Sequence, residues 1–558
     1  MALSEPSFDY DPFHAYDHDR EAKETSFASL LGVAARAIKL RSHSPADMDP
    51  VPMHQRSWTM WDYTSYWLSD GFNVATWNMA SSMLAVGLSW KQALPAIAIG
   101  HFIIALAVTA NGTIGARLHI PFPVLNRSSF GYWLSYFSVI SRCVLAMFWF
   151  GVQCVTGGQC VYQCLPESAN ITTVDMMCYF LYWLIQLPFL LVSPHKIRYL
   201  FIAKAVLAPV TGLSMMIWAF VRTGGGPIFE QKATISGSAL SWAMLSAMNS
   251  AIGNYATLSV NIPDFTRYAR SPRDQYIQVL IIPVIFTFFA FMGIAGGSLF
   301  LCLKLYPTSY PVTSAGNVIY GEILWNPLTL IDHWDNRAAA FFASFVFCLA
   351  TIGTNVSANS ISAANDFTAL LPKAGRLWLN IKRGQILCAL IGGWVVCPWE
   401  ILGSAIGFLN FMGGYTVFLG PICSIMIVDY WLVHKGNIDI PALYDPKGRY
   451  RYVGGVNWRA LLALCVSVPP NLPGLIHSIN PKIDVGLGGQ HLFSIAWLLG
   501  FSLAGVTYFI TSTLFPPRET MVDELITGDD QTSQSNDLEN VTDEKHSDVK
   551  VKVTTHAA

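Results

Sequence analysis

Long apolar runs recur along most of this sequence, and they constrain the fold more than any other feature. A helix needs about 20 consecutive apolar residues to cross the hydrocarbon core of a bilayer. Runs of that length begin near residue 67 and recur as far as residue 515. Charged residues make up 12% of the chain, against about 25% in ordinary soluble domains. The sequence therefore predicts an all-α membrane protein that crosses the bilayer many times.

The apolar runs predict twelve transmembrane helices. Their approximate bounds are 67–89, 93–113, 133–160, 173–194, 199–222, 238–260, 277–305, 339–363, 385–402, 405–433, 457–478 and 491–515. The loops after even-numbered spans hold most of the Lys and Arg, whereas those after odd-numbered spans hold few, such as Lys91 and Lys232. Because positively charged loops stay in the cytosol, we expect both termini to be cytosolic.

The two ends of the chain are polar and charged, and we expect them to be disordered tails. We divide the chain into an N-terminal tail (1–58), a twelve-span domain (59–516) and an acidic C-terminal tail (517–558). The first residues do not resemble a cleavable signal peptide. Lysines in the tails could receive ubiquitin from the trafficking machinery, or the tails could simply be solubilising. A net charge of −1 gives no indication of nucleic-acid binding.

The sequence gives little support for an enzyme, a metal site or a cofactor. Most of the 11 cysteines lie inside apolar runs, where cysteine behaves as a small hydrophobic residue rather than as part of a disulfide framework. The 13 histidines are scattered, and neither an HExxH nor a GxSxG motif is present. The motifs of metalloproteases and serine hydrolases are therefore missing.

Two spans contain short segments that are unusual inside a membrane helix. SDGFNVATW (69–77) in span one and SAIGNYATLS (250–259) in span six both place Gly and Asn beside an Ala-Thr step. In many transporters, two interrupted helices in matching positions of inverted repeats form the substrate site. The pattern predicts a break in each span, with Gly253 and Asn254 at the second. The alternative is close helix packing through small residues.

Polar side chains in spans three and eight are spaced to share a helix face. Trp149 and Gln153 are four residues apart, as are Asn355 and Asn359, and residues at this spacing lie side by side on a helix. A buried amide is unfavourable without a hydrogen-bond partner. The asparagines therefore either line a polar cavity or bond to neighbouring helices, and we favour the cavity for Asn359.

Three charged residues fall inside or near predicted spans. Lys204 in span five could extend its ammonium to the cytosolic surface, but a charge within a membrane is a functional candidate by default. Asp70, beside the predicted break in span one, is its candidate partner. Arg142 in span three is expected to be an anchor or gate element rather than a ligand.

Taken together, these segments resemble the nucleobase–cation symporter-1 family, and within it the fungal uracil, allantoin and uridine permeases. The matching stretches include AMFWFGVQ (146–153), VNIPDFTRYAR (260–270) and GTNVSANSISAANDFTALLP (353–372), and the resemblance extends from about residue 57 to 460. It implies two inverted five-helix repeats plus two extra helices, a plasma-membrane location and transport of a small heterocycle.

The resemblance also implies roles for individual residues. The substrate would lie between spans one, three, six and eight, in contact with Trp149, Gln153, Gly253, Asn254 and Asn359. The family has a second tryptophan near the span-six break, where this chain has Gly-Asn-Tyr. Tyr255 or another aromatic residue could take its place. In span ten, Phe411 and Met412 would form an outer gate, with ordinary close packing as the alternative.

The resemblance indicates a cation site as well. The family's sodium site uses carbonyls of span one together with residues that correspond to Ala350, Gly353 and Thr354. Gly353 replaces a hydroxyl-bearing residue, so one oxygen ligand is missing for a cation that needs several. A proton is therefore the expected coupling ion, with Asp70 and Lys204 as its candidate carriers.

Three function classes follow from these observations. The first is a proton-coupled symporter that imports a uracil-, allantoin- or uridine-type heterocycle by alternating access. A permease for thiamine or another heterocycle is a variant of this first class. The second class is a membrane nutrient sensor that has the same fold but does not transport. The third, a membrane enzyme, is disfavoured by the missing motifs.

Overall fold

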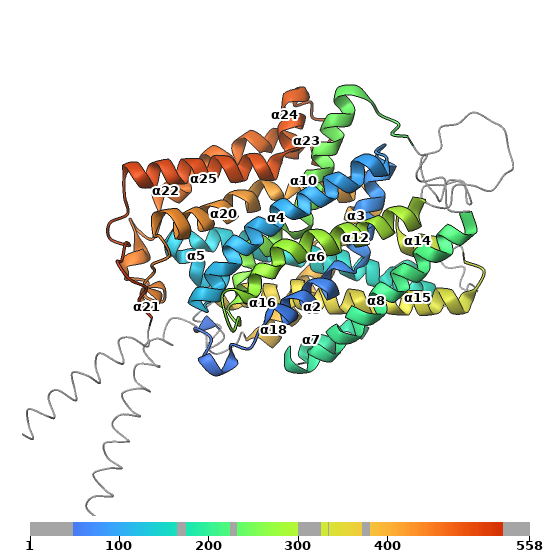
Figure 1. The fold of residues 1–558 in the computed structure, drawn as a ribbon, viewed down its shortest axis with the longest axis horizontal. Coiled ribbons are helices and arrows are strands. Elements are labelled where there is room, and N and C mark those ends of the chain that lie inside the picture. Colours follow the sequence, from blue (N-terminus) through green and yellow to red (C-terminus); the bar gives the residue numbers. More distant parts are fainter. Residues whose placement is uncertain are drawn as a thin grey trace, which may run out of the picture.

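The computed structural model describes residues 48–164, 174–192, 194–223, 232–298, 325–332, 334–370 and 380–527. This part of the chain is helical, and its extended pairing is limited to three isolated bridges, Trp58–Ala269, Asp439–Ile526 and Val453–Val456. Figure 1 shows the long helices packed side by side, with α22 and α25 along one side and α7, α8 and α15 toward the other. The all-α prediction is confirmed.

Helices make up most of the described part of the chain. The α-helices are α2 (Met60–Gly71), α3 (Val74–Ala85), α4 (Trp90–Leu118), α5 (Phe122–Phe130), α6 (Ser135–Cys164), α7 (Val174–Leu191), α8 (Pro194–Thr223), α10 (Gly237–Asn261), α11 (Pro263–Thr266), α12 (Gln278–Ser298), α14 (Pro327–Asp332), α15 (Arg337–Thr354), α16 (Ser362–Leu370), α18 (Ile381–Leu390), α19 (Ala405–Gly414), α20 (Thr416–Val428), α21 (Ile440–Leu443), α22 (Trp458–Ser467), α23 (Leu472–Ile479), α24 (Gly486–Phe493) and α25 (Ala496–Leu514). Three π-helical segments, η4 (Asn355–Ile361), η5 (Ile391–Val395) and η7 (Asp429–Val433), join or extend them. Short 3-10 turns are η2 (Met53–Gln55), η3 (Asp274–Ile277), η6 (Pro398–Gly403), η8 (Arg449–Arg451) and η9 (Pro469–Asn471).

Nine helices in the described part of the chain are long and apolar enough to cross a membrane. The other three predicted spans also fall on helices. Span one is divided between α2 and α3, span six is α10, and span nine is α18 continued by η5 and η6. The chain is thus a multi-pass membrane protein. The count of twelve spans and the inverted repeat stay predictions.

The predicted break in span one is present. Helix α2 ends at Gly71, and α3 begins at Val74 after Asn73, whose side chain accepts a hydrogen bond from the Thr76 backbone N–H at 2.9 Å. This is a standard N-cap, which satisfies one of the free donors at a helix start. Phe72, with φ −83° and ψ 75°, lies outside the helical region between the two helices.

The predicted break in span six is wrong, because α10 is continuous from Gly237 to Asn261. Gly253 serves close packing instead. A Cβ atom at this position would lie 2.1 Å from the Met412 carbonyl oxygen, so only glycine lets the α10 and α19 backbones come this close. The small-residue packing that the sequence left as an alternative is what the structure contains.

Irregular geometry appears instead in spans eight and ten. The π-helical segment η4 separates α15 from α16, and Tyr415 separates α19 from α20. Such π-helical segments inside α-helices are frequent at functional sites. A second interrupted span is therefore span ten rather than span six.

A buried ion pair fixes the end of α6 against α16. The Arg142 Nε donates to the Asp366 Oδ2 at 2.5 Å, and a second guanidinium nitrogen donates to the Ser362 carbonyl. The side chains of Arg142 and Asp366 are both fully buried. The Asn261 amide at the end of α10 lies 3.1 Å from the Ser362 hydroxyl, so the residue whose carbonyl accepts from Arg142 also contacts a third helix. Arg142 is an anchor, in agreement with the expectation that it is not a ligand.

Chain segments next to both tails pack against the loop after η7. Ile526 pairs with Asp439 in a β-bridge, and the His434 Nε2 lies 2.9 Å from the Thr520 hydroxyl. Burial opposes the charged imidazole, but the Asp429 carboxylate at 3.1 Å outweighs it and raises the pKa of His434. The His434–Asp429 pair therefore stabilises the fold at and below the ordinary imidazole pKa, and this stabilisation is lost as the pH rises through the raised pKa of His434.

The predictions about the tails concern mostly residues 1–47 and 528–558, which lie outside the described residues. The domain boundaries stay predictions.

The Arg142–Asp366 pair gives a prediction about stability. Arg142→Met leaves the Asp366 carboxylate buried without its partner, which is expected to destabilise the protein by about 3–5 kcal/mol. The double variant Arg142→Met/Asp366→Leu removes both charges and should recover part of that loss. Thermal unfolding of the purified protein in detergent measures both effects. A double variant that is no more stable than Arg142→Met would contradict this account of the pair.

Candidate functional site

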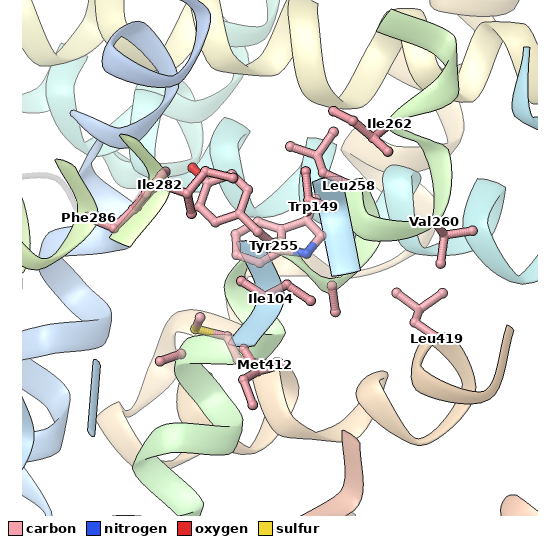
Figure 2. Packing of buried hydrophobic residues seen from close by; sticks show 14 of the residues in the cluster. Ile104, Trp149, Tyr255, Leu258, Val260, Ile262, Ile282, Phe286, Met412 and Leu419 are labelled. Carbon is pink, nitrogen blue, oxygen red and sulfur yellow. The ribbon is translucent and has the colours of Figure 1, made fainter. Parts of the chain in front are cut away.

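Helix α6 contributes an indole and an amide to the interior of the bundle. Trp149 and Gln153 lie on one face of this helix and are 7% and 2% exposed. The indole contacts the rings of Phe411, Tyr415 and Phe408 at centroid distances of 5.5, 6.4 and 6.4 Å, all in T-shaped geometry. Figure 2 shows Trp149 within a cluster that includes Met412 of α19. These three rings meet the indole edge-on, so none of them stacks parallel on its face.

The Gln153 amide differs from most polar groups in the bundle. Its Oε1 is buried and has no hydrogen-bond partner among the described residues. A buried acceptor in this state is unfavourable by about 1–3 kcal/mol, and such atoms in native structures call for an explanation. A ligand donor at this oxygen would supply one.

The asparagines of span eight have different surroundings. The Asn355 Nδ2 donates to the Gln186 Oε1 of α7 at 2.9 Å and to the Phe150 carbonyl of α6 at 3.3 Å. Asn355 therefore bonds to neighbouring helices, which was one of the two alternatives. The Asn359 Nδ2 donates to the Asn355 Oδ1 at 3.0 Å. Asn359 is thus placed next to α6 by a residue that is itself fixed.

Helix α10 brings Gly253 and Asn254 to the same region. The Gly253 carbonyl accepts a hydrogen bond from the Tyr415 hydroxyl at 2.6 Å, and Tyr415 also contacts the Trp149 ring. Asn254 is 9% exposed, and its Nδ2 is buried without a partner among the described residues. One unpaired acceptor, on Gln153, and one unpaired donor, on Asn254, therefore come from the two helices on either side of Tyr415.

Tyr255 has a role that the sequence did not suggest. Its ring packs edge-on against Trp67 and Phe286 at 5.4 and 4.4 Å, and its hydroxyl donates to the Asp70 carbonyl at 3.1 Å. Figure 2 places it in the same cluster as Trp149. Since its hydroxyl bonds to the Asp70 carbonyl at the break between α2 and α3, Tyr255 is positioned to support that break. Its suggested role as a second stacking ring stays a prediction.

The predicted gate residues of span ten lie on α19. Met412 is fully buried, with its carbonyl against Gly253. Phe411 is partly buried and contacts the rings of Trp149 and Tyr415 at 5.5 and 5.3 Å. Both residues therefore lie between α10 and the aromatic side chains of α6, where a movement of α19 would change access to Trp149.

Lys204 does not extend to the membrane surface. It is 2% exposed, and its ammonium donates a hydrogen bond to the Thr354 hydroxyl at the end of α15. The Lys204 Nζ lies 3.9 Å from the Asp70 Oδ1 at the end of α2. One buried cation therefore joins α2, α8 and α15. Ala350, one turn before Thr354, is also buried.

Two of the oxygen atoms on the residues around the Lys204 ammonium already accept hydrogen bonds. The Thr354 hydroxyl is bonded to Lys204, and the Asp70 carbonyl accepts from the Asn73 Nδ2 at 2.5 Å and from the Tyr255 hydroxyl. A hard cation needs several oxygen ligands. The Thr354 hydroxyl and the Asp70 carbonyl already accept hydrogen bonds, whereas the two carboxylate oxygens of Asp70 have no hydrogen-bond partner among the described residues. No group of three or more His, Cys, Asp or Glu within the described ranges could hold another metal.

A multi-pass helical protein with an interrupted helix, a buried cation and unpaired amides at its centre has the architecture of a membrane transporter. Residues 50–500 match the family model described as permease for cytosine/purines, uracil, thiamine, allantoin. The chain belongs to this family, the nucleobase–cation symporter-1 family, whose members are transporters and not enzymes.

Named relatives and a solved structure agree with this assignment. The chain is 34% identical to the uracil permease of Saccharomyces cerevisiae, over 89% of this chain and 80% of that protein. It is 33% identical to the allantoin permease of the same yeast, over 86% and 77%. The inward-facing structure of Mhp1 matches with a TM-score of 0.64 over 86% of this chain and 96% of that one. At 22% identity, that likeness shows the fold alone.

The hydrogen bonds of Asn355 lead to a prediction that separates it from Asn359. Asn355→Ala leaves the Gln186 Oε1 without its donor and should destabilise the protein by about 1–3 kcal/mol. Asn359→Ala removes one hydrogen bond and leaves the others of Asn355 in place, so its effect should be smaller. Thermal unfolding of the two variants side by side tests this order, and equal melting temperatures would contradict it.

Proposed function

We propose that this protein is a proton-coupled symporter that imports a neutral heterocycle of the uracil, allantoin or uridine type by alternating access. The proposal includes twelve spans as two inverted five-helix repeats plus two extra helices. It also includes a plasma-membrane location with both termini in the cytosol. The family assignment supports a nucleobase-like substrate, and the yeast relatives named for uracil and allantoin narrow the chemical class.

The observation that carries the proposal is the pair of unpaired buried amide atoms on α6 and α10, the two helices that Tyr415 contacts through the Trp149 ring and the Gly253 carbonyl. Oε1 of Gln153 is an acceptor and Nδ2 of Asn254 is a donor, and neither has a partner among the described residues. Uracil- and allantoin-type rings present alternating N–H and C=O groups along one edge, which would satisfy both atoms. Their flat faces suit stacking on the Trp149 indole. Asn359 is the remaining amide that can reach the ligand.

Such a site selects by polarity more than by size. A ring that lacks the N–H or C=O group leaves an amide of the protein buried and unpaired, and sites of this kind reject such analogues strongly. Substitution around Trp149, Asn254 and Met412 is then expected to change which heterocycle is preferred.

The surroundings of Lys204 support a proton as the coupling ion. Its ammonium donates a hydrogen bond to the Thr354 hydroxyl and lies near the Asp70 carboxylate. The Lys204 side chain therefore already supplies a positive charge at the position where the resemblance would put a sodium ion. A proton can be added to Asp70 without a new ligand set. The loaded site would then hold the Lys204 ammonium with a neutral Asp70, and the empty site would hold the ion pair.

Alternating access connects these two sites. In the proposed repeat arrangement, spans one, two, six and seven move as a bundle against spans three, four, eight and nine. Asp70 lies on the bundle and Thr354 on the other part, so Lys204 bridges the two. Protonation of Asp70 weakens its attraction to Lys204 and thereby changes the equilibrium between conformations, which is the requirement for coupling.

Uptake measurements test the function directly. In cells that lack their own permeases, the protein should accumulate at least one of radiolabelled uracil, allantoin or uridine, and a protonophore should abolish accumulation. A competition panel that adds cytosine, uric acid and thiamine identifies the preferred ring. Binding without accumulation would instead indicate a sensor, and accumulation that survives the protonophore would contradict proton coupling.

Substitution of the α6 amide tests the site. Gln153→Ala should raise the KM for the transported ring by at least about fivefold, because a lost hydrogen bond to a buried polar group is worth about 1–3 kcal/mol. Asn359→Ala should act in the same direction. Gln159→Ala, two turns away on α6, is the matched control. Normal KM in either site variant, at equal surface amounts, removes that residue from the site.

A further inference from the structure

Tyr415 forms the joint between the two halves of span ten and reaches across to α10. Helix α19 ends at Gly414 and α20 begins at Thr416, with Tyr415 between them at φ −75° and ψ −14°. Its hydroxyl donates to the Gly253 carbonyl at 2.6 Å. Its ring lies 5.3 Å from Phe411 and 6.4 Å from Trp149. Tyr415 therefore contacts the aromatic side of the proposed substrate site and the backbone of α10 at once.

The hydroxyl of Tyr415 belongs to a seam of polar contacts between α10 and span ten. Ser250 donates to the Leu409 carbonyl at 3.3 Å, and the Asn249 Nδ2 lies 3.5 Å from the Thr416 hydroxyl. The backbones are in direct contact at Gly253. The hydrogen bond of Tyr415 is the shortest of these contacts. Among the side chains that make them, Tyr415 is the one that also contacts the Trp149 ring.

The seam is closed in this structure. The proposed substrate residues Trp149, Gln153, Asn254 and Asn359 are each less than a tenth exposed. For a ligand to reach these residues, either α19 must separate from α10, or the helices on the side of the site away from α19 must move. A hydrogen bond that exists only in the closed arrangement stabilises that arrangement relative to the open one.

We infer that Tyr415 is a positioning residue that latches α19 to α10 in the closed state, through the bond from its hydroxyl to the Gly253 carbonyl. The bond breaks when α19 moves away and opens the site. A ring bound on Trp149 acts on the latch through the contact between the Trp149 and Tyr415 rings. This role goes beyond the gate residues Phe411 and Met412 and rests on the proposed transport function.

Tyr415→Phe tests the latch, because it removes the hydroxyl and keeps the ring. Without the bond, more of the protein should be open before the ligand binds. The KM for external substrate should therefore fall two- to fivefold, and Vmax per surface transporter should fall because closure is slower. A rise in KM would make Tyr415 a substrate contact, and unchanged kinetics would make its hydroxyl merely structural; either result overturns the latch. Tyr276→Phe, which removes a hydroxyl from an exposed residue, is the matched control.

Cysteine labelling tests the latch without substrate. In a Cys397→Ser/Cys465→Ser background, which removes both thiols that are exposed among the described residues, Leu409→Cys places a thiol on the α19 side of the seam. The proposed topology puts this end of α19 outside the cell, so a membrane-impermeant maleimide can reach it when the seam opens. Adding Tyr415→Phe should raise the labelling rate several-fold.

The two experiments separate failure of the latch from failure of the proposed function. An unchanged labelling rate in Tyr415→Phe overturns the latch, whatever the protein transports. Faster labelling in a protein that carries none of the tested heterocycles would support the latch and contradict the proposed function.

Discussion

A positive charge buried between helices determines the arrangement of this protein's centre. The ammonium of Lys204 is out of water, so it needs partners from the protein, and it finds them in the Thr354 hydroxyl and the Asp70 carboxylate. Asp70 is available because α2 ends beside it, and Asn73 and Tyr255 hold that helix end by bonding to the Asp70 carbonyl. The interrupted helix, the buried lysine and the end of α15 therefore depend on one another.

The same rule of satisfied polar groups supports the proposed ligand site. Asn355, Arg142 and Trp67 are buried polar side chains that bond to neighbouring helices, and they explain how the bundle is held together. The amides of Gln153 and Asn254 each retain an unpaired atom. Gln153 lies one turn from Trp149 on α6. Asn254 follows Gly253, whose carbonyl accepts from Tyr415, which in turn contacts the Trp149 ring. Other buried polar atoms of the described residues also lack a partner, so these two amides support a place for a polar ring only together with the Trp149 indole and the family assignment.

Much of this could be predicted from the sequence, and the remainder depended on contacts distant along the chain. The break at Gly71–Asn73, the shared face of Trp149 and Gln153, and the Asp70–Lys204 pair follow from local spacing and from the energetics of charge in a membrane. Gly253 was assigned to a break because glycine permits either a break or a close approach. The choice is made by Met412 of α19, which local sequence cannot reveal. Tyr415 was missed for the same reason, since its hydrogen-bond partner is 162 residues away.

In the proposed mechanism, Lys204 supplies the positive charge that sodium would otherwise provide, and a proton couples transport to the gradient. The most direct test is to measure the electrical current across a membrane that contains the purified protein, in solutions without sodium. Adding the transported heterocycle should evoke a current that grows as the pH of the substrate side is lowered, and Lys204→Met should abolish the current while substrate still binds. A current that appears only when sodium is added, or that persists unchanged in Lys204→Met, would contradict the account.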